Sequence, residues 1–310
     1  MARRLTQELV VTDKVTALAG YGLTPAALSA ATIATQARTP LVVMAAATSA
    51  ITERSPYVVR TSFTVPQAIV VMADWANKNG VRKAVTLVSD YGPGIDAETF
   101  FKKQFPAGGG EVVGELRVPL ANPDFSPFLQ RVADAKPDAL FVFLPSGAGA
   151  PFMKQYVERG LDKSGMKLIG VGGGMTDDDT MKEMTDASIG TFTSFHYSTA
   201  HDPALNKRFV EGIADSSGGR RVNYMAVGTY DGMRVIMKGL KASKGAVGDA
   251  LLEAMKGQSF ESLRGPVTID PQTRGIVQNI YIRKTERVGP QLYNVEFETF
   301  KNVKDPGKGA

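Results

Sequence analysis

Short apolar runs alternate with longer amphipathic stretches through the first two thirds of the chain, and this alternation limits the fold most. Continuous apolar runs, such as residues 41–45 and 139–144, are typical of strands buried on both faces of a sheet. The stretches between them have the periodicity and length of crossover helices, which force successive strands to pair in parallel. The sequence therefore predicts an α/β fold with doubly wound, Rossmann-like parallel sheets.

The expected elements change in character after Tyr197. Before it, we expect strands at 15–19, 41–45, 84–88, 112–118, 139–144, 168–171 and 190–195, and helices at 2–10, 25–36, 66–79, 95–104, 125–135 and 150–159. After it, we expect helices at 203–215, 225–241 and 247–255, followed by strands at 265–270, 276–284 and 291–297. Two sets of strand–helix units are joined near residues 60–64, and the chain returns near residues 195–198. This organisation indicates two domains, which the length of 310 residues allows.

The composition excludes several classes of protein. The chain has no cysteine, which excludes a disulfide framework, a thiolate metal site and a cysteine nucleophile. Its 43% apolar content and net charge of +5 exclude a disordered chain, and the scattered basic residues do not favour nucleic-acid binding. The longest apolar run, residues 41–47, is far shorter than the roughly 18 residues of a membrane span. The first residues do not have the pattern of a signal peptide.

Two turns that follow expected strands combine small residues with hydroxyl groups. The first turn contains Gly22 and Thr24, and the second contains Ala46, Ala47 and Thr48. The turns of a parallel sheet meet at its carboxyl edge, where two helix N-termini would hold a carboxylate through their N–H groups. The alternative interpretation is that both threonines are ordinary N-cap residues.

Nucleotide chemistry is poorly supported. Gly20 and Gly22 begin a dinucleotide fingerprint, but Pro25 stands at its third glycine position and no acidic residue ends the next strand. The glycine-rich segment 170–174 lacks the lysine and Ser/Thr of a phosphate loop. We interpret it as a flexible turn capped by Thr176, and we expect no cofactor.

The remaining polar candidates do not form a catalytic or metal site. His196 and His201 are five residues apart without an evident third ligand, and Ser146 lacks the preceding glycine of a nucleophile elbow. His196 is either a hinge or pocket hydrogen-bonding group or a surface residue. Asp177–Asp179 are interpreted as an acidic first helical turn, with a calcium or other cation as the alternative. Tyr91 ends a strand of the second set and so points toward the same cleft region as the two turns, unless it packs locally in its own turn.

A series of segments in consistent order carries a family resemblance: residues 41–48, 57–61, 89–94, 122–125, 136–140, 202–207 and 264–270. With these segments the chain resembles the type I periplasmic solute-binding proteins of ABC importers, in the leucine/isoleucine/valine-binding family. The resemblance implies two α/β lobes joined by a hinge, which close on a small ligand in the cleft between them. We expect lobe I at 1–62 and 195–278, and lobe II at 63–194 and 279–310. The resemblance also implies a non-catalytic periplasmic protein that serves ABC permease subunits, and we expect a monomer.

The resemblance also assigns roles to the turns. It implies that the turns at Thr24 and at Ala46 to Thr48 hold the carboxylate of the ligand, while Tyr91 closes over the ligand from the second lobe. The expected ligand-binding residues are Gly22, Thr24, Ala46, Ala47, Thr48, Tyr91, Ser146, Gly173 and His196.

The chain departs from the family pattern in three places, and the second departure bears on the ligand. The strand, helix and strand that open family members are absent here, as is their export signal, so we expect a missing strand and an unpaired edge in lobe I. Amino-acid binders carry a glutamate for the ligand's ammonium where this chain has Gly172–Gly174, and a family tyrosine is replaced by Pro145–Gly147. A buried ammonium without a counter-charge costs several kcal/mol. Either Asp177 replaces the glutamate, or the ligand has no amino group.

We therefore predict a binding protein for a small carboxylate such as an aromatic acid. The first alternative is a binding protein for a branched-chain or other amino acid. The second is the ligand-sensing domain of a receptor or regulator, and an α/β enzyme is the third.

Overall fold

The computed structural model describes residues 1–308, and it divides the chain into two compact units. The first unit comprises residues 1–67 and 224–279, together with 301–308, and the second comprises 68–223 and 280–300. The chain therefore passes between the units four times. Within the described residues, no helix has the length and apolar character needed to cross a membrane.

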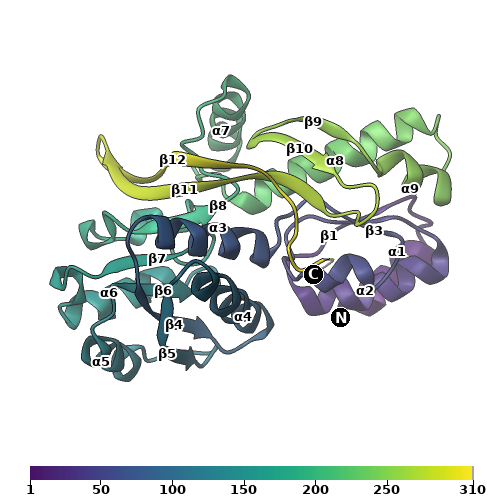
Figure 1. Ribbon diagram of the computed structural model, residues 1–310. Helices are drawn as coiled ribbons and strands as arrows, with labels where there is room; N and C mark the ends of the chain where they lie inside the picture. The colour runs from purple at the N-terminus through teal and green to yellow at the C-terminus, as the bar shows by residue number, and fades with distance from the viewer. Residues whose placement is uncertain (309–310) are drawn as a thin grey trace. The chain divides into compact units, whose positions relative to one another are not determined.

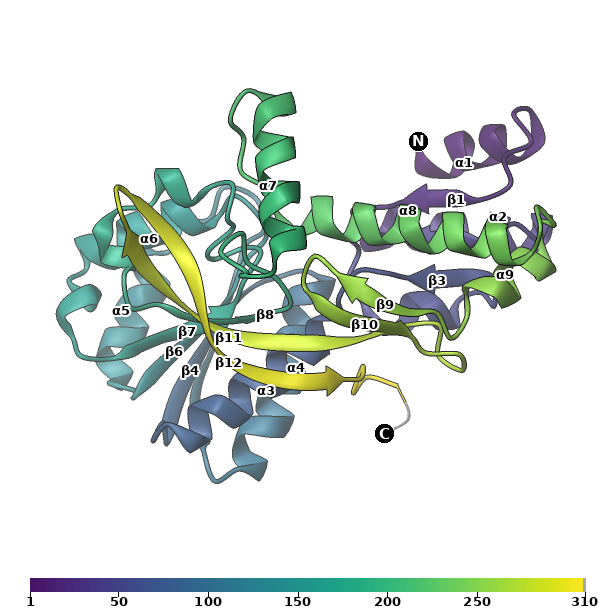
Figure 2. The same cartoon turned by 90° about the horizontal axis from the view of Figure 1, so that it is seen from above.

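The first unit is built around a short parallel sheet between two layers of helices. Its strands are β1 (Leu18–Gly20), β2 (Leu41–Val43) and β3 (Val58–Arg60), in that order. Helices α1 (Ala2–Val11) and α2 (Thr24–Ala37) lie on one side, and α8 (Tyr224–Ala242) and α9 (Asp249–Met255) lie on the other (Figures 1 and 2). The unit also contains the 3-10 helix η1 (Ser49–Glu53) and the antiparallel strands β9 (Ser259–Ser262) and β10 (Gly265–Ile269).

Small side chains let α2 approach this sheet closely. Its inner face consists of Ala27, Ala30, Ala31 and Ala34, which are fully buried in one core with the three residues of β2. Burial of this apolar surface stabilises the packing of α2 on the sheet. The turns that follow β1 and β2 therefore start from a closely packed core.

The second unit contains the larger sheet, with parallel strands in the order β5-β4-β6-β7-β8. Its strands and helices, in chain order, are α3 (Val65–Lys78), β4 (Lys83–Ser89), α4 (Gly92–Ala107), β5 (Glu111–Val118), α5 (Ser126–Ala135), β6 (Ala139–Phe143), α6 (Gly149–Glu158), β7 (Lys167–Val171), β8 (Phe192–Phe195), α7 (Ala204–Ser217), β11 (Ile276–Val288) and β12 (Gln291–Val303). The 3-10 helices η2 (Leu161–Lys163), η3 (Met181–Glu183) and η4 (Asp186–Ser188) complete it. Residues 65–67 of α3, 276–279 of β11 and 301–303 of β12 lie in the first unit. Because α3 and α4 cover one face and α5 and α6 the other, the sheet is doubly wound (Figures 1 and 2).

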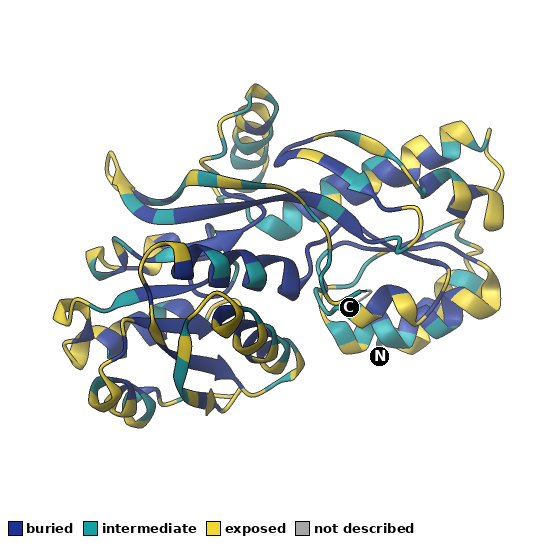
Figure 3. Ribbon diagram, viewed as in Figure 1, coloured by how far each residue is buried: buried dark blue, intermediate teal, exposed yellow. Residues whose placement is uncertain are grey.

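Strand order places a topological switch point between β4 and β6. The chain turns outward from β4 to β5 and then crosses back to β6, so the crossovers from β4 and from β6 run on opposite faces. Ligands of doubly wound sheets bind in the crevice outside the carboxyl ends of the strands at such a point. The strands are mostly buried while the outer helix faces are exposed (Figure 3).

The predicted α/β class is confirmed, but the sheets are not entirely parallel. Strand β11 pairs antiparallel with β8, and β10 pairs antiparallel with β11 in the first unit. The short strands β3 and β9 were not predicted, and β11 and β12 extend beyond their predicted ends. Both missed strands have at most four residues, too few for a periodicity to appear.

Residues 195–223 belong to the second unit, although the prediction placed them in the first lobe. They are anchored there by side-chain hydrogen bonds. His201 Nδ1 lies 2.6 Å from Oε2 of Glu296, and the hydroxyl of Ser198 donates to the carbonyl of Asn294 at 2.5 Å. The expected boundaries missed this because the partners are strands that follow much later in the chain.

Residues 301–308 belong to the first unit, although the prediction placed them in the second lobe. Gln67 donates through Nε2 to the carbonyl of Val303 at 2.8 Å, and Ser49 donates to Oδ1 of Asp305, also at 2.8 Å. The last described residues therefore lie beside η1.

Candidate functional site

The two predicted turns of the first unit lie together. Strands β1 and β2 are parallel neighbours, with Leu18 opposite Leu41, so the turns that follow them leave the same edge. The N–H of Ala46 donates to the carbonyl of Tyr21 at 3.0 Å, and Oγ1 of Thr24 lies 2.9 Å from Oγ1 of Thr48. Gly22 is exposed and Ala47 is half-buried on the same two turns.

Neither threonine side chain makes a capping hydrogen bond. The N-cap interpretation is wrong for Thr24, because Leu23 is the N-cap residue of α2 and Thr24 is its first helical residue. Thr48 does occupy the N-cap position of η1, but its hydroxyl does not cap that helix. A pair of hydroxyl groups has two protons, of which the mutual bond uses one. The second proton is available to an anion.

Arg60 lies behind the Thr48 turn and is not among the residues predicted from the sequence. Its side chain is fully buried, and Nη2 donates to the carbonyl of Thr48 at 2.5 Å. Nε and Nη1 have no hydrogen-bond partner among the described residues. Burial lowers the pKa of Arg60 to about 10, against which the charges of Asp305 and Glu53 act, so the guanidinium stays protonated at neutral pH. A charged residue ending the apolar strand β3 was the available signal.

The predicted residues of the second unit follow four neighbouring parallel strands. Tyr91 follows β4, Ser146 follows β6, Gly173 follows β7 and His196 follows β8. Since the carboxyl ends of these strands share one edge, the topology brings the four residues to that edge, with Tyr91 and Ser146 on either side of the switch point.

Tyr91 is the N-cap residue of α4 and is half-buried. Its ring centroid lies 6.4 Å from that of Phe143, at the end of β6. Burial raises the pKa of its hydroxyl to about 12, so the phenol is neutral and can donate a hydrogen bond.

Ser146 and Asp177 form a pair at this edge. Ser146 is exposed, and its hydroxyl donates to Oδ2 of Asp177, which is buried. No lysine or arginine of the described chain lies within 4 Å of this carboxylate. Burial raises the pKa of Asp177 to about 7, while the bond from Ser146 acts to lower it. Asp177 is therefore a buried hydrogen-bonding group that changes charge near neutral pH.

The glycine run after β7 is a packing requirement, and the interpretation as a flexible turn is wrong. A Cβ on Gly172 would lie 1.8 Å from Nη2 of Arg283, and one on Gly174 would lie 1.8 Å from the carbonyl oxygen of Leu144. At Gly173, φ is +89° and a Cβ would lie 2.7 Å from the ring of Phe195. No side chain, acidic or otherwise, fits this turn as it stands.

The segment after this turn also differs from the prediction. Thr176 is no cap, because its hydroxyl accepts from Nη2 of Arg283 at 3.4 Å, and no α-helix follows. Asp178 is buried and accepts from Nδ2 of Asn294 at 3.0 Å, so the acidic residues do not form an exposed first turn. Burial raises the pKa of Asp178, opposed by the charge of Arg283.

The two histidines have separate surroundings. His196 is buried, and its ring centroid lies 4.4 Å from that of Phe195. The alternative that it is a surface residue is therefore wrong. His201 pairs with Glu296 and lies 5.1 Å from the ring of Tyr281. Across residues 1–308, no group of three or more histidines and carboxylates is close enough to hold a metal ion.

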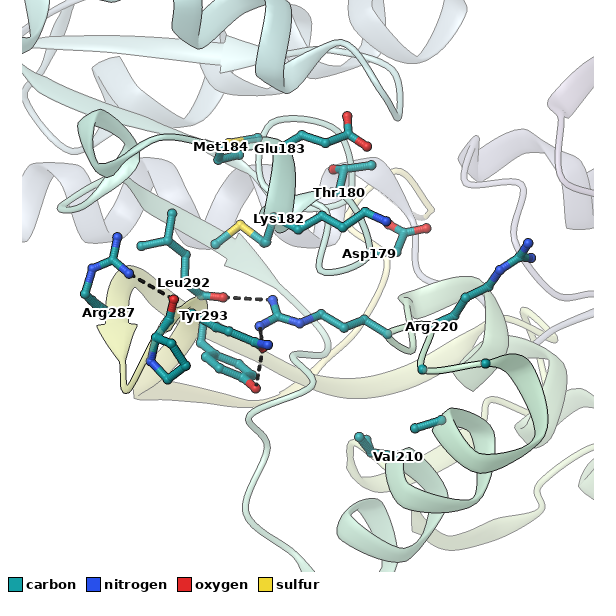
Figure 4. Close-up of a pocket in the computed structure, with 17 residues that line it drawn as sticks. Asp179, Thr180, Lys182, Glu183, Met184, Val210, Arg220, Arg287, Leu292 and Tyr293 are labelled. Atoms are coloured by element: carbon teal, nitrogen blue, oxygen red, sulfur yellow. Dashed lines mark hydrogen bonds between the residues drawn. The ribbon is translucent and has the colours of Figure 1, made fainter.

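A cavity of about 750 Å³ lies elsewhere in the second unit. Figure 4 shows it between η3, the residues that follow α7, and the turn from β11 to β12. Arg221 lies 4.2 Å from the ring centroid of Tyr293 and donates to the carbonyl of Leu292 at 2.8 Å. The residues that line this cavity include none of the nine predicted ligand-binding residues.

The comparisons with known proteins agree with this architecture. Residues 1–289 match the model of a family described as periplasmic binding protein. The chain belongs to this family. Among its relatives, Leu/Ile/Val-binding protein homolog 6 of Brucella abortus (strain 2308) is 44% identical over 313 residues, which cover 100% of this chain and 80% of the relative. The family resemblance stated from the sequence is confirmed.

Two solved structures are similar over 99% of the chain. One is a solute-binding protein of an ABC transporter from Rhodopseudomonas palustris BisB5 in complex with 3,4-dihydroxybenzoic acid, with 58% identity, a TM-score of 0.95 and 85% of its own chain covered. The other is a solute-binding protein of an ABC transporter from R. palustris HaA2 in complex with p-hydroxybenzoic acid, with 43% identity, a TM-score of 0.94 and 84% covered. This chain therefore has the type I periplasmic-binding-protein fold. Its family consists of binding proteins rather than catalysts.

Proposed function

We propose that this chain is a non-catalytic solute-binding protein that binds a small aromatic carboxylate. The observation that carries the proposal is the Thr24–Thr48 hydroxyl pair, with the buried cation of Arg60 behind its turn. A hydroxyl proton donates to a carboxylate, and a buried positive charge acts on it in a medium of low dielectric constant. Gly22, Ala46 and Ala47 let the anion approach the backbone because they are small.

The second unit supplies groups suited to a hydroxylated ring. The neutral phenol of Tyr91 offers a donor and an aromatic face, and Gly173 and His196 complete the edge. The Ser146–Asp177 pair offers acceptors for a ring hydroxyl, and a hydroxyl bonded to a carboxylate makes a short, strong hydrogen bond. The ligands of the two Rhodopseudomonas proteins are hydroxylated benzoic acids, which supports this assignment.

An amino-acid ligand is the second candidate. The relative's name and the position of Asp177 favour it, because an ionised Asp177 would be the counter-charge for an ammonium group. An ammonium group would then have to hold Asp177 ionised against the burial that raises its pKa to about 7. A ring hydroxyl does not require this, because a protonated Asp177 keeps a carbonyl oxygen that can accept its hydrogen bond.

We propose that the protein works in the periplasm, as a monomer that delivers its ligand to the membrane subunits of an ABC permease. Its membership of the periplasmic binding protein family and the transporter role of its structural relatives support this.

Calorimetric titration with 3,4-dihydroxybenzoate, 4-hydroxybenzoate, benzoate and leucine tests the function. We expect the hydroxylated acids to bind and leucine not to bind. Asp177→Ala is expected to weaken binding of 4-hydroxybenzoate while leaving benzoate unchanged, because only the former has a ring hydroxyl. Tight leucine binding that Asp177→Ala abolishes would reject the aromatic acid in favour of an amino acid.

A further inference from the structure

Residues 303–308 hold the Thr48 turn from behind, within the first unit. The segment is fixed at its start, where the carbonyl of Val303 accepts from Nε2 of Gln67 at 2.8 Å. It then lies against η1, where Oδ1 of Asp305 accepts from the hydroxyl of Ser49 at 2.8 Å and from the N–H of Gly307 at 3.0 Å. Ser49 directly follows Thr48, so this carboxylate acts on the turn that carries the hydroxyl pair.

The packing of this segment is close. A Cβ on Gly307 would lie 2.5 Å from the hydroxyl oxygen of Ser49, so only glycine allows this approach. Lys308 donates through Nζ to the hydroxyl of Thr52, which is fully buried. Ser49 and Thr52 are one turn apart in η1, and the segment therefore binds both ends of that turn.

Asp305 has a second, electrostatic effect on the same site. Its charge acts to raise the pKa of Arg60, against the larger effect of burial, yet the two side chains form no ion pair within 4 Å. Loss of the Asp305 charge would leave the Thr48 turn in a more positive potential and favour an anion. Loss of its hydrogen bond to Ser49 would loosen the turn and disfavour the anion.

We propose that Asp305 is a positioning residue of the carboxylate site. By accepting from Ser49, it holds Thr48 at the distance at which its hydroxyl pairs with that of Thr24. The proposal rests on the proposed function, because it takes these hydroxyls as the anchor of the ligand. It assigns a binding role to the segment after β12, which contributes no side chain to the hydroxyl pair.

The test compares Asp305→Ala, Asp305→Asn, Ser49→Ala and the Asp305→Ala/Ser49→Ala double variant by calorimetric titration with 3,4-dihydroxybenzoate. Asp305→Ala and Ser49→Ala are each expected to raise Kd about 5- to 10-fold, the effect of one hydrogen bond. The double variant is expected to match the larger single effect, because both changes remove the same bond. Asp305→Asn keeps the Oδ1 acceptor and is expected to stay within about 2-fold of the parent protein.

Failure of the positioning role and failure of the proposed function would give different results. Unchanged or tighter binding by Asp305→Ala, with Thr48→Val still weakening it, would overturn the positioning role alone. Unchanged binding in both Thr24→Val and Thr48→Val would instead overturn the proposed carboxylate site.

Amide hydrogen exchange of the ligand-free protein is the readout that needs no ligand. Residues 48–52 are expected to exchange faster in Asp305→Ala than in Asp305→Asn, while β2 stays protected. Equal exchange of residues 48–52 in both variants would overturn the proposal whichever ligand binds. A general loss of stability would not produce this local difference.

Discussion

Replacing the two threonine hydroxyls separately and together tests the anion site most directly. In Thr48→Val the side chain keeps its shape but can no longer donate to a carboxylate. A hydrogen bond to a charged group contributes about 1.5–3 kcal/mol, so Kd is expected to rise roughly 10- to 150-fold. Thr24→Val is expected to fall in the same range, since the oxygens lie 2.9 Å apart and each orients the other. The double variant is expected to lose little more than the weaker-binding single variant, because either change already breaks the pair.

Calorimetric titration with 3,4-dihydroxybenzoate at constant pH and salt measures these effects. Thr229→Val is the matched control, because its hydroxyl is exposed on α8 and bonds only to the carbonyl of Met225. It is expected to bind like the parent protein. Fully additive losses in the double variant would show that the hydroxyls act independently, and unchanged binding in all variants would place the carboxylate elsewhere.

Two further predictions concern stability. Burial raises the pKa of Asp177 from 3.8 to about 7, so between these values the folded chain binds more protons than the unfolded chain. The free energy of unfolding is therefore expected to fall as pH rises from about 4 to 7, by up to about 1.4 kcal/mol per pH unit. Urea unfolding at pH 5 and pH 7 should show that the unfolding free energy depends less on pH in Asp177→Asn than in the parent protein. An equal change in unfolding free energy in the two proteins would contradict the raised pKa of Asp177. Gly174→Ala is expected to lower the unfolding free energy by about 1–3 kcal/mol, because its Cβ would lie 1.8 Å from the carbonyl oxygen of Leu144. Gly212→Ala, in α7 with no atom within 4 Å of the new Cβ, should instead raise it by up to about 1 kcal/mol, and a Gly174→Ala protein as stable as this control would contradict the packing argument.

Local patterns in the chain were sufficient to predict the α/β class and the shared edge of the two hydroxyl-bearing turns. Apolar runs such as those of β6 and β7 predict buried strands, and the helical stretches between them require parallel pairing. Parallel pairing in turn puts the turns after β1 and β2 at one edge, as it does for Tyr91 and Ser146. These inferences need only neighbouring residues and the geometry of a crossover connection.

Side-chain partners depended on the tertiary structure. Whether Thr24 and Thr48 cap helices or bond each other depends on the register of β1 against β2, in which Leu18 lies opposite Leu41. The glycine run seemed a flexible turn because the atoms it contacts, on Arg283 and Leu144, are distant in sequence. Periodicity carries no information about such contacts.

Burial of charge was likewise decided only by the folded chain. Asp177 and Arg60 are ordinary polar residues in the sequence, and their shifted pKa values arise from the water that folding removes. The unit to which residues 301–308 belong was decided by Gln67 and Ser49, more than 230 residues away. Local sequence determines which elements form, whereas long-range packing and desolvation determine which side chains meet and what charge they carry.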